Sequence, residues 1–247
     1  MGILHMVNAD PARTPAFAMF ARPDYYLTTG STTCNGSCVT QTTSFAYDHG
    51  DYAAEINTNW LGMAGPGVKQ LGVDGTGAAN GPSSAGADSG QVTVPQSGTT
   101  GPWADETDIR PTIMYLTGLK DDYAHDGRVI TEILASPNQA LSPSTVTRLG
   151  ECYKQLNSSV GEFGTATLQA ATKAIESTSS RDSAYQRTDR ILYVLEAARD
   201  GLAGQIKTEL EAAAFNGTPI SAREAQGQTM ACQFLITVAQ RLAQHTS

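Results

Sequence analysis

The strongest constraint on the fold is the spacing of apolar residues in the second half of the chain. Six of them follow one another at intervals of 3, 4, 3, 4 and 3 residues: Val146, Leu149, Tyr153, Leu156, Val160 and Phe163. This spacing places all six on one face of an α-helix, as in helices that pack against one another. Ser142 and Pro143 supply an N-cap and a first helical residue. The pattern predicts one helix from residue 142 to about residue 177.

Two further helices are predicted after it. The next one, of about 34 residues and ~50 Å, ends at the C-cap signal Asn216-Gly217. The last one opens with a capping box, Ser221 to Glu224. Its apolar residues are expected to be buried: Phe234, Leu235, Val238 and Leu242. Because short connections make consecutive helices antiparallel, residues 142–247 are predicted to form an all-α three-helix antiparallel bundle.

The first half of the chain has a different composition. Residues 24–28 and 59–64 are typical of short strands, and residues 108–117 are typical of a helix with Pro111 in its first turn. A second short helix is predicted at about 127–135. Residues 74–102 hold seven Gly and three Pro, a composition typical of a surface insertion.

Charge and hydropathy exclude two classes of partner. Sixteen Lys and Arg against 24 Asp and Glu give a net charge of −8, which disfavours nucleic acid binding through a basic face. The sequence has no run of about 18 apolar residues, so no membrane span is expected. Its first residues have neither a basic region nor a sustained apolar one and do not form a signal peptide.

Four cysteines favour an oxidising compartment, extracellular or at the cell surface. Cys34 and Cys38 are expected to form a disulfide, with free thiols or a metal site as alternatives. Cys152 and Cys232 lie on two of the predicted helices and are a second candidate pair, which the sequence leaves open.

Asp48 and His49 are the candidate metal ligands. A carboxylate beside an imidazole, followed by Gly50, presents two ligands to one divalent ion. The alternative is a loop histidine that only makes structural hydrogen bonds, because one turn seldom supplies a complete metal site.

Four motifs occur in a characteristic order: Asp48-His49-Gly50, Gly65-Pro66-Gly67, Asp108-Ile109-Arg110-Pro111-Thr112 and Asp126-Gly127-Arg128. This order resembles the C-terminal end of the alkaline phosphatase superfamily of metal-dependent phosphatases, phosphodiesterases and sulfatase-like hydrolases. The resemblance covers roughly residues 8–135. It implies an α/β fold with a mostly parallel sheet, two metal ions, Zn²⁺ foremost, and a Ser or Thr nucleophile. The expected architecture is thus a partial α/β domain over 1–135 followed by the helical bundle.

Two alignments to that family are open. In one, Asp48 and His49 both bind metal, and Glu106 stands where a further histidine is expected. In the other, which needs no missing ligand, His49 is the family's last metal-ligating histidine and Asp48 need not touch metal. Glu106 is then a carboxylate favoured by a helix N-terminus.

The family's nucleophile and most of its metal ligands belong to an N-terminal half that does not match this chain. The chain alone is therefore expected to bind metal weakly or not at all and to be inactive. One hypothesis is the C-terminal portion of a metal-dependent phosphoester or sulfoester hydrolase, with that N-terminal half as its partner. The alternative is a non-catalytic interaction or assembly module built on the helical bundle.

Overall fold

The computed structural model describes most of the second half of the chain and shorter stretches of the first half. The described residues are 1–7, 10–21, 25–27, 38–39, 41, 59–71, 103–120, 122–178 and 180–246. The Gly-rich residues 74–102 and the candidate ligands Asp48 and His49 all lie outside the described residues.

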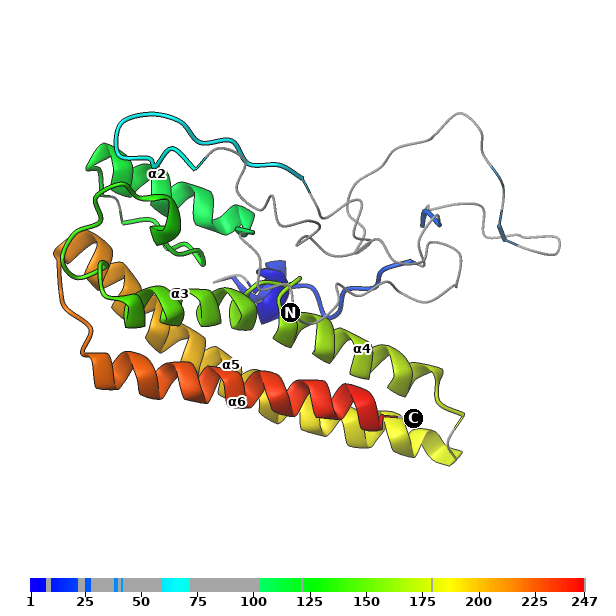
Figure 1. The fold of residues 1–247 in the computed structure, drawn as a ribbon. Helices are drawn as coiled ribbons and strands as arrows, with labels where there is room; N and C mark the ends of the chain where they lie inside the picture. The colour runs from blue at the N-terminus through cyan, green and yellow to red at the C-terminus, as the bar shows by residue number, and fades with distance from the viewer. Residues whose placement is uncertain are drawn as a thin grey trace.

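The second half of the chain forms a bundle of four helices (Figure 1). They are α3 (Ser144–Asn157), α4 (Glu162–Glu176), α5 (Ser183–Asn216) and α6 (Ala222–His245). Helices α3 and α4 run one after the other in roughly the same direction, α5 returns along both, and α6 runs back beside them. Helix α6 packs against the other three. The expected three-helix count is therefore wrong, because the first predicted helix is two helices.

The break between α3 and α4 is fixed by two glycines. A Cβ on Gly161 would lie 2.5 Å from the carbonyl oxygen of Gln155, and one on Gly164 would lie 2.4 Å from that of Ser159. Only glycine permits so close an approach of the backbone. The apolar spacing continues across the break, which is why periodicity alone predicts one uninterrupted helix.

The ends of α5 and α6 follow the sequence signals. Gly217 has a φ of 67° and ends α5 in the left-handed conformation expected of a C-cap glycine. The Ser221 hydroxyl accepts a 3.1 Å hydrogen bond from the backbone N–H of Glu224 and caps α6. These two predicted boundaries are confirmed.

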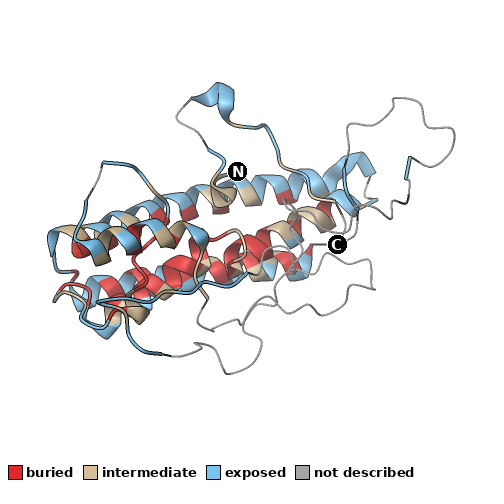
Figure 2. Cartoon of the chain, turned by 90° about the horizontal axis from the view of Figure 1, so that it is seen from above, coloured by how far each residue is buried: buried red, intermediate tan, exposed pale blue. Residues whose placement is uncertain are grey.

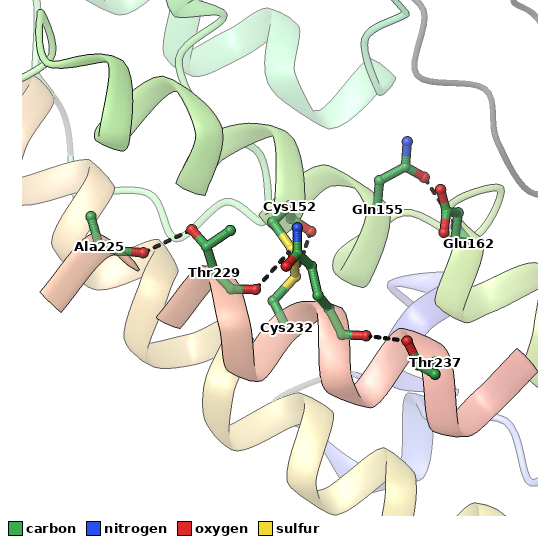
Figure 3. Close-up of a disulfide and its surroundings, with 8 residues drawn as sticks. Cys152, Gln155, Glu162, Ala225, Thr229, Cys232 and Thr237 are labelled. Carbon is green, nitrogen blue, oxygen red and sulfur yellow. Dashed lines mark hydrogen bonds between the residues drawn. A yellow bond between two sulfur atoms is a disulfide. The ribbon is translucent and has the colours of Figure 1, made fainter. Parts of the chain in front are cut away.

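A disulfide between Cys152 and Cys232 joins α3 to α6 (Figure 3). Its two Cα atoms are 6.3 Å apart, and both residues are buried. The pair that the sequence left open is thus formed. Cys38 is also disulfide-bonded, whereas Cys34, its predicted partner, lies outside the described residues.

The core lies between the helices, where the buried residues face one another (Figure 2). Leu149, Leu156, Phe163 and Ile206 are completely buried. One expected core residue is not: Phe234 is 66% exposed, because it lies on the side of α6 opposite Cys232. Burying Phe234 was thus a wrong prediction.

The predicted α/β region is also wrong. The described residues contain no strand, only an isolated antiparallel bridge between Val68 and Leu134. Residues 59–64 are irregular, and Trp60 is 87% exposed, so no sheet formed by the described residues covers this apolar run. Directly after it, Gly65 and Gly67 adopt positive φ angles and turn the chain. Without a second strand beside it among the described residues, the run forms no ladder.

Helix α2 (Ile109–Thr117) is where the sequence predicts a helix, and it follows a 3-10 turn, η3 (Glu106–Asp108). The Thr112 hydroxyl accepts a hydrogen bond from the backbone N–H of Ile130. The hydroxyl of Tyr115 accepts one from the backbone of Asn138, and its ring packs edge-on against Phe215 of α5. These contacts attach α2 to the bundle. The short helix expected at 127–135 is only a 3-10 turn, η4 (Thr131–Ile133).

Candidate functional site: a buried network of charges

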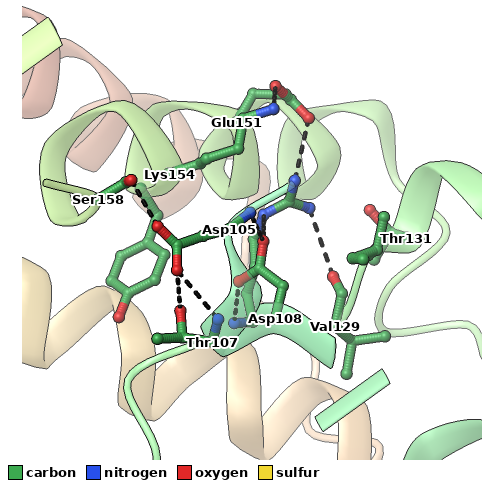
Figure 4. Close-up of polar contacts among 12 residues, drawn as sticks. Asp105, Thr107, Asp108, Val129, Thr131, Glu151, Lys154 and Ser158 are labelled. Carbon is green, nitrogen blue, oxygen red and sulfur yellow. Dashed lines mark hydrogen bonds and ion pairs between the residues drawn. The ribbon is translucent and has the colours of Figure 1, made fainter. Parts of the chain in front are cut away.

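Charged side chains gather where η3 and the segment after α2 meet α3 (Figure 4). Two acidic residues organise the start of η3. The Asp105 carboxylate accepts hydrogen bonds from the backbone N–H and the hydroxyl of Thr107, and from the hydroxyl of Ser158, which directly follows α3. The backbone N–H of Asp105 in turn points at the carboxylate of Asp108. This reciprocal capping box fixes both carboxylates.

Arg128 is the centre of the network. Its side chain is only 2% exposed, and its two terminal nitrogens donate hydrogen bonds of 2.8 and 2.6 Å to the two oxygens of Glu132. A third bond, of 3.2 Å, reaches Glu151 on α3. The backbone N–H of Arg128 donates a 2.8 Å bond to Asp108, whose carboxylate is also 3.9 Å from Nε. A forked guanidinium suits this bidentate pairing, which a lysine would not reproduce.

Burial and charge act in opposite directions on the three carboxyl groups around Arg128. Burial raises the pKa of Asp108, although the Arg128 charge opposes the shift. Burial also acts to raise the pKa of Glu132, but the charge and hydrogen bonds of Arg128 outweigh it and lower that pKa. The pKa of Glu151 is raised, first by burial and then by its hydrogen bond with Glu132. Glu132 is therefore the main counter-ion of Arg128.

Lys154 extends the network along α3. Its ammonium group lies 2.9 Å from a carboxylate oxygen of Glu151 and donates a hydrogen bond to the carbonyl oxygen of Trp103. The same group sits 4.6 Å from the centre of the Trp103 indole. The Lys154 side chain is almost fully buried by these contacts, so its charge is directed at protein groups.

A second cluster surrounds Asp126. Its carboxylate lies 3.2 Å from Nδ1 of His5 and 3.5 Å from the ammonium group of Lys207 on α5. The hydrogen bond from His5 is the main reason why the pKa of Asp126 falls to about 2. The Asp126 carbonyl accepts hydrogen bonds from the Tyr153 hydroxyl and the Asn157 amide. The cluster joins the N-terminal residues to α3 and α5.

Neither cluster has the arrangement of a metal centre. Among the described residues, no group of three or more His, Cys, Asp or Glu side chains is placed to hold a metal ion. The carboxylates of Asp105, Asp108 and Asp126 all accept hydrogen bonds from, or pair with, protein groups. What the arrangement does is hold residues 103–134 against the bundle.

The structure places only part of the predicted site. The candidate ligands Asp48 and His49 remain predictions, because both lie outside the described residues. Glu106 is exposed and accepts a 2.9 Å hydrogen bond from the side chain of Asn59. Arg128, Glu132 and Glu151 were not predicted as a cluster. The only signal for it was the four-residue spacing of Arg128 and Glu132, which suits an ion pair on a helix, and this segment forms only a 3-10 turn.

Comparison of the chain with protein-family models, with curated proteins and with solved structures finds no match. In the part of the chain that the structure describes, no helix combines the length and the apolarity needed to cross a bilayer. That finding agrees with the expectation from hydropathy.

Proposed function

We propose that this chain is a non-catalytic interaction module built on a disulfide-linked helical bundle. The proposal rests on the partners of Asp108 and Asp126, the acidic residues with which the third and fourth motifs of the sequence begin. Asp108 binds the backbone of Arg128, and Asp126 pairs with His5 and Lys207. A catalytic acid or a metal ligand needs oxygen lone pairs directed at substrate or metal, and these carboxylates direct theirs at protein.

The surface of the bundle supports the same proposal. Helix α5 is 34 residues long, and its exposed apolar side chains include Tyr193 and Val194, which are 76% and 64% exposed. Met230 and Phe234 are exposed apolar side chains on α6. Large apolar side chains in solvent on two of the helices favour an interaction surface. The disulfides favour an oxidising compartment, extracellular or at the cell surface.

A second candidate function is the C-terminal portion of a metal-dependent phosphoester or sulfoester hydrolase. One observation favours it: the hydrogen bond between Arg128 and Asp108 brings together two motifs of the alkaline phosphatase resemblance that are far apart in sequence. In this candidate, an N-terminal half supplies the nucleophile, and His49, with or without Asp48, binds a divalent ion, Zn²⁺ foremost.

An activity assay of the purified chain tests the first candidate, because turnover would overturn it. The absence of turnover does not exclude the second candidate, whose nucleophile would come from an N-terminal half. Aryl phosphate, bis-aryl phosphate and aryl sulfate esters are offered with Zn²⁺, Mg²⁺ or Mn²⁺, and we expect no turnover. Titration calorimetry with Zn²⁺ is expected to give weak binding at most. Turnover that is lost in His49→Ala but retained in His245→Ala, a substitution at an exposed histidine at the end of α6, would replace the first candidate by the second.

A further inference from the structure

The charges gathered around Arg128 do not cancel when every carboxyl group is ionised. The network encloses two cations, Arg128 and Lys154, with the carboxyl groups of Asp108, Glu132 and Glu151. The side chains of Arg128, Lys154 and Asp108 are at most 4% exposed. Those of Glu132 and Glu151 are 28% and 37% exposed. An uncompensated charge is costly in such a place, and one additional proton makes the five groups neutral.

Two of these carboxyl groups meet at one nitrogen atom. Nη2 of Arg128 lies 2.6 Å from Oε1 of Glu132 and 3.2 Å from Oε1 of Glu151. The two glutamates are also within hydrogen-bonding reach of each other. Two carboxylates so close repel each other, whereas a carboxyl group that keeps its proton donates a hydrogen bond to its neighbour. The geometry thus suits one proton between two carboxyl groups.

The contacts of the two glutamates differ, and they place this proton on Glu151. Both oxygens of Glu132 accept hydrogen bonds from the fork of Arg128, and one also accepts a bond from the Thr131 hydroxyl. Each oxygen of Glu151 has one cationic partner, Arg128 at 3.2 Å or Lys154 at 2.9 Å. The raised pKa of Glu151, caused by burial and by its hydrogen bond with Glu132, agrees with this placement. So does the lowered pKa of Glu132, whose burial is outweighed by the charge and hydrogen bonds of Arg128.

We propose that Glu151 and Glu132 share one proton, and that the release of this proton as the pH rises loosens residues 103–134 from the bundle. In the release step, the O–H bond of Glu151 breaks and its electron pair stays on the carboxylate. The proton passes to water at the exposed side of Glu151. Two ionised glutamates then converge on the single guanidinium of Arg128, with one negative charge in excess.

Other charged groups act on the same proton from three segments. Asp105 and Asp108 lie at η3, Arg128 and Glu132 lie between α2 and α3, and Lys154 lies on α3. The two cations favour release of the proton, and the carboxylates favour its retention. In the part of the chain that the structure describes, Glu151 makes no ion pair with α5 or α6.

Asp108 is the other carboxyl group of the network whose pKa is raised, an effect of its burial. Figure 4 shows Asp108 and Glu151 at opposite sides of the cluster. The backbone N–H of Arg128 already donates a hydrogen bond to Asp108, so this carboxyl group acts as an acceptor. Substitution of each residue separately distinguishes the two positions of the proton.

The direction of the pH dependence follows from the state that binds the proton more tightly. Glu151 titrates at its ordinary pKa of 4.5 when the segment is detached, whereas its pKa is higher when the segment is attached. The attached state therefore keeps the proton at pH values at which the detached state has lost it. The stabilisation from this proton is complete below about pH 4.5 and is lost as the pH rises through the higher pKa. One proton limits the change in the equilibrium constant for detachment to about tenfold per pH unit.

Amide hydrogen exchange of the full chain between about pH 5 and pH 8 tests the proposal. The backbone N–H groups of Arg128 and Ile130 donate hydrogen bonds to Asp108 and Thr112, so they exchange when the segment opens. Glu151→Gln puts a neutral amide in place of the carboxyl group at every pH. Because the substitution is distant in sequence, the ratio of exchange rates in wild type and variant equals the ratio of their opening constants. We expect this ratio to rise with pH, by up to about tenfold per unit, until Glu151 is ionised in the attached state as well.

The matched control is Glu211→Gln, because Glu211 is an exposed glutamate on α5. It removes the same charge, and its ratio should stay constant over the same pH range. A constant or falling ratio for Glu151→Gln overturns the proposal. So does a pH dependence of opening that disappears in Asp108→Asn but persists in Glu151→Gln, because the proton would then reside on Asp108.

Circular dichroism shows whether Glu151→Gln folds. If it does not, the carboxyl ¹³C chemical shifts of the wild-type chain decide, because they follow the titration of each glutamate directly. We expect Glu151 to titrate above pH 4.5, and a Glu151 that titrates at or below that value overturns the proposal. Either failure would leave the non-catalytic assignment untouched, since the ester and metal assays test that separately.

Discussion

The backbone N–H of Arg128 donates a 2.8 Å hydrogen bond to the buried carboxylate of Asp108, 20 residues earlier in the chain. Arg128 also binds Glu132 and Glu151. Together these contacts link η3 to the segment between α2 and α3, and link that segment to α3. These contacts hold residues 103–134 to the bundle. Because the polar groups are buried, the loss of any one partner is expected to destabilise the fold.

Removing the Asp108 carboxylate is expected to destabilise the fold. Asp108→Ala leaves the Arg128 N–H without its partner and removes one counter-charge, which costs about 2–4 kcal/mol of unfolding free energy. Asp108→Asn keeps an oxygen acceptor and avoids burying a charge, so its loss is smaller. Urea unfolding measures both, with Asp122→Ala at an exposed position as the control, expected within about 0.5 kcal/mol of wild type. Equal losses for Ala and Asn would contradict the hydrogen-bonding role.

Removal of the Cys152–Cys232 disulfide is expected to lower the unfolding free energy by about 2–5 kcal/mol, because the bridge closes a loop of 80 residues in the unfolded chain. The double variant Cys152→Ala with Cys232→Ala avoids leaving free thiols. Guanidinium unfolding of wild type and variant, with and without reductant, gives the measurement. If the double variant is as stable as the oxidised wild type, the bridge does not stabilise the bundle.

Asp126 is expected to make stability depend on pH in the acid range. Its pKa is about 2 in the folded chain against 3.8 for a free aspartate, so the unfolded chain takes up the proton first as the pH falls. The stabilisation from Asp126 is thus complete above about pH 4 and lost as the pH falls towards 2. Because Asp126 is half exposed, solvent screening keeps the effect small.

Urea midpoints at several pH values between 2 and 6 measure the effect of Asp126. Asp126→Asn should show a weaker loss of stability between pH 4 and pH 2 than the wild type. The control Asp122→Asn should follow the wild-type profile. A variant profile that runs parallel to the wild type would show that the contact with His5 and Lys207 does not persist in solution.

The helical half of the fold was predictable because its signals are local. The cap at Ser221 and the end at Gly217 depend on a few adjacent residues, and the structure places both as predicted. The α/β prediction depended on motif order and on two short runs typical of strands. Short apolar runs such as residues 59–64 specify a strand only when a neighbouring strand pairs with them, and that partner is not local.

The exposure of Phe234 and the charged network around Arg128 could not be predicted from the sequence, because both depend on contacts between residues far apart in the chain. Phe234 fits the apolar pattern of a buried helix face, but which face of α6 meets the core is set by Cys232 and the three helices around it. Arg128 meets Glu151 only after α3 has packed against the segment behind α2. Of the predicted site, Asp48 and His49 stay predictions.

The break between α3 and α4 can be tested with a matched pair of Gly→Ala substitutions. Gly164→Ala would place a Cβ 2.4 Å from the carbonyl oxygen of Ser159, so the backbone has to shift, at a cost of about 1–3 kcal/mol. Gly204→Ala lies inside α5 with nothing within 4 Å of the added carbon. Alanine is the better helix former, so this variant should gain about 0.5–1 kcal/mol.

Thermal and urea unfolding of the two variants should therefore move in opposite directions from the wild type. Propensity alone would make both changes stabilising, because Gly164 also lies within a helix, in the first turn of α4. A stabilised Gly164→Ala would mean that α3 and α4 can join into one continuous helix, as the apolar spacing predicts. A destabilised Gly164→Ala beside a stabilised Gly204→Ala would show that close backbone packing at the break divides that helix.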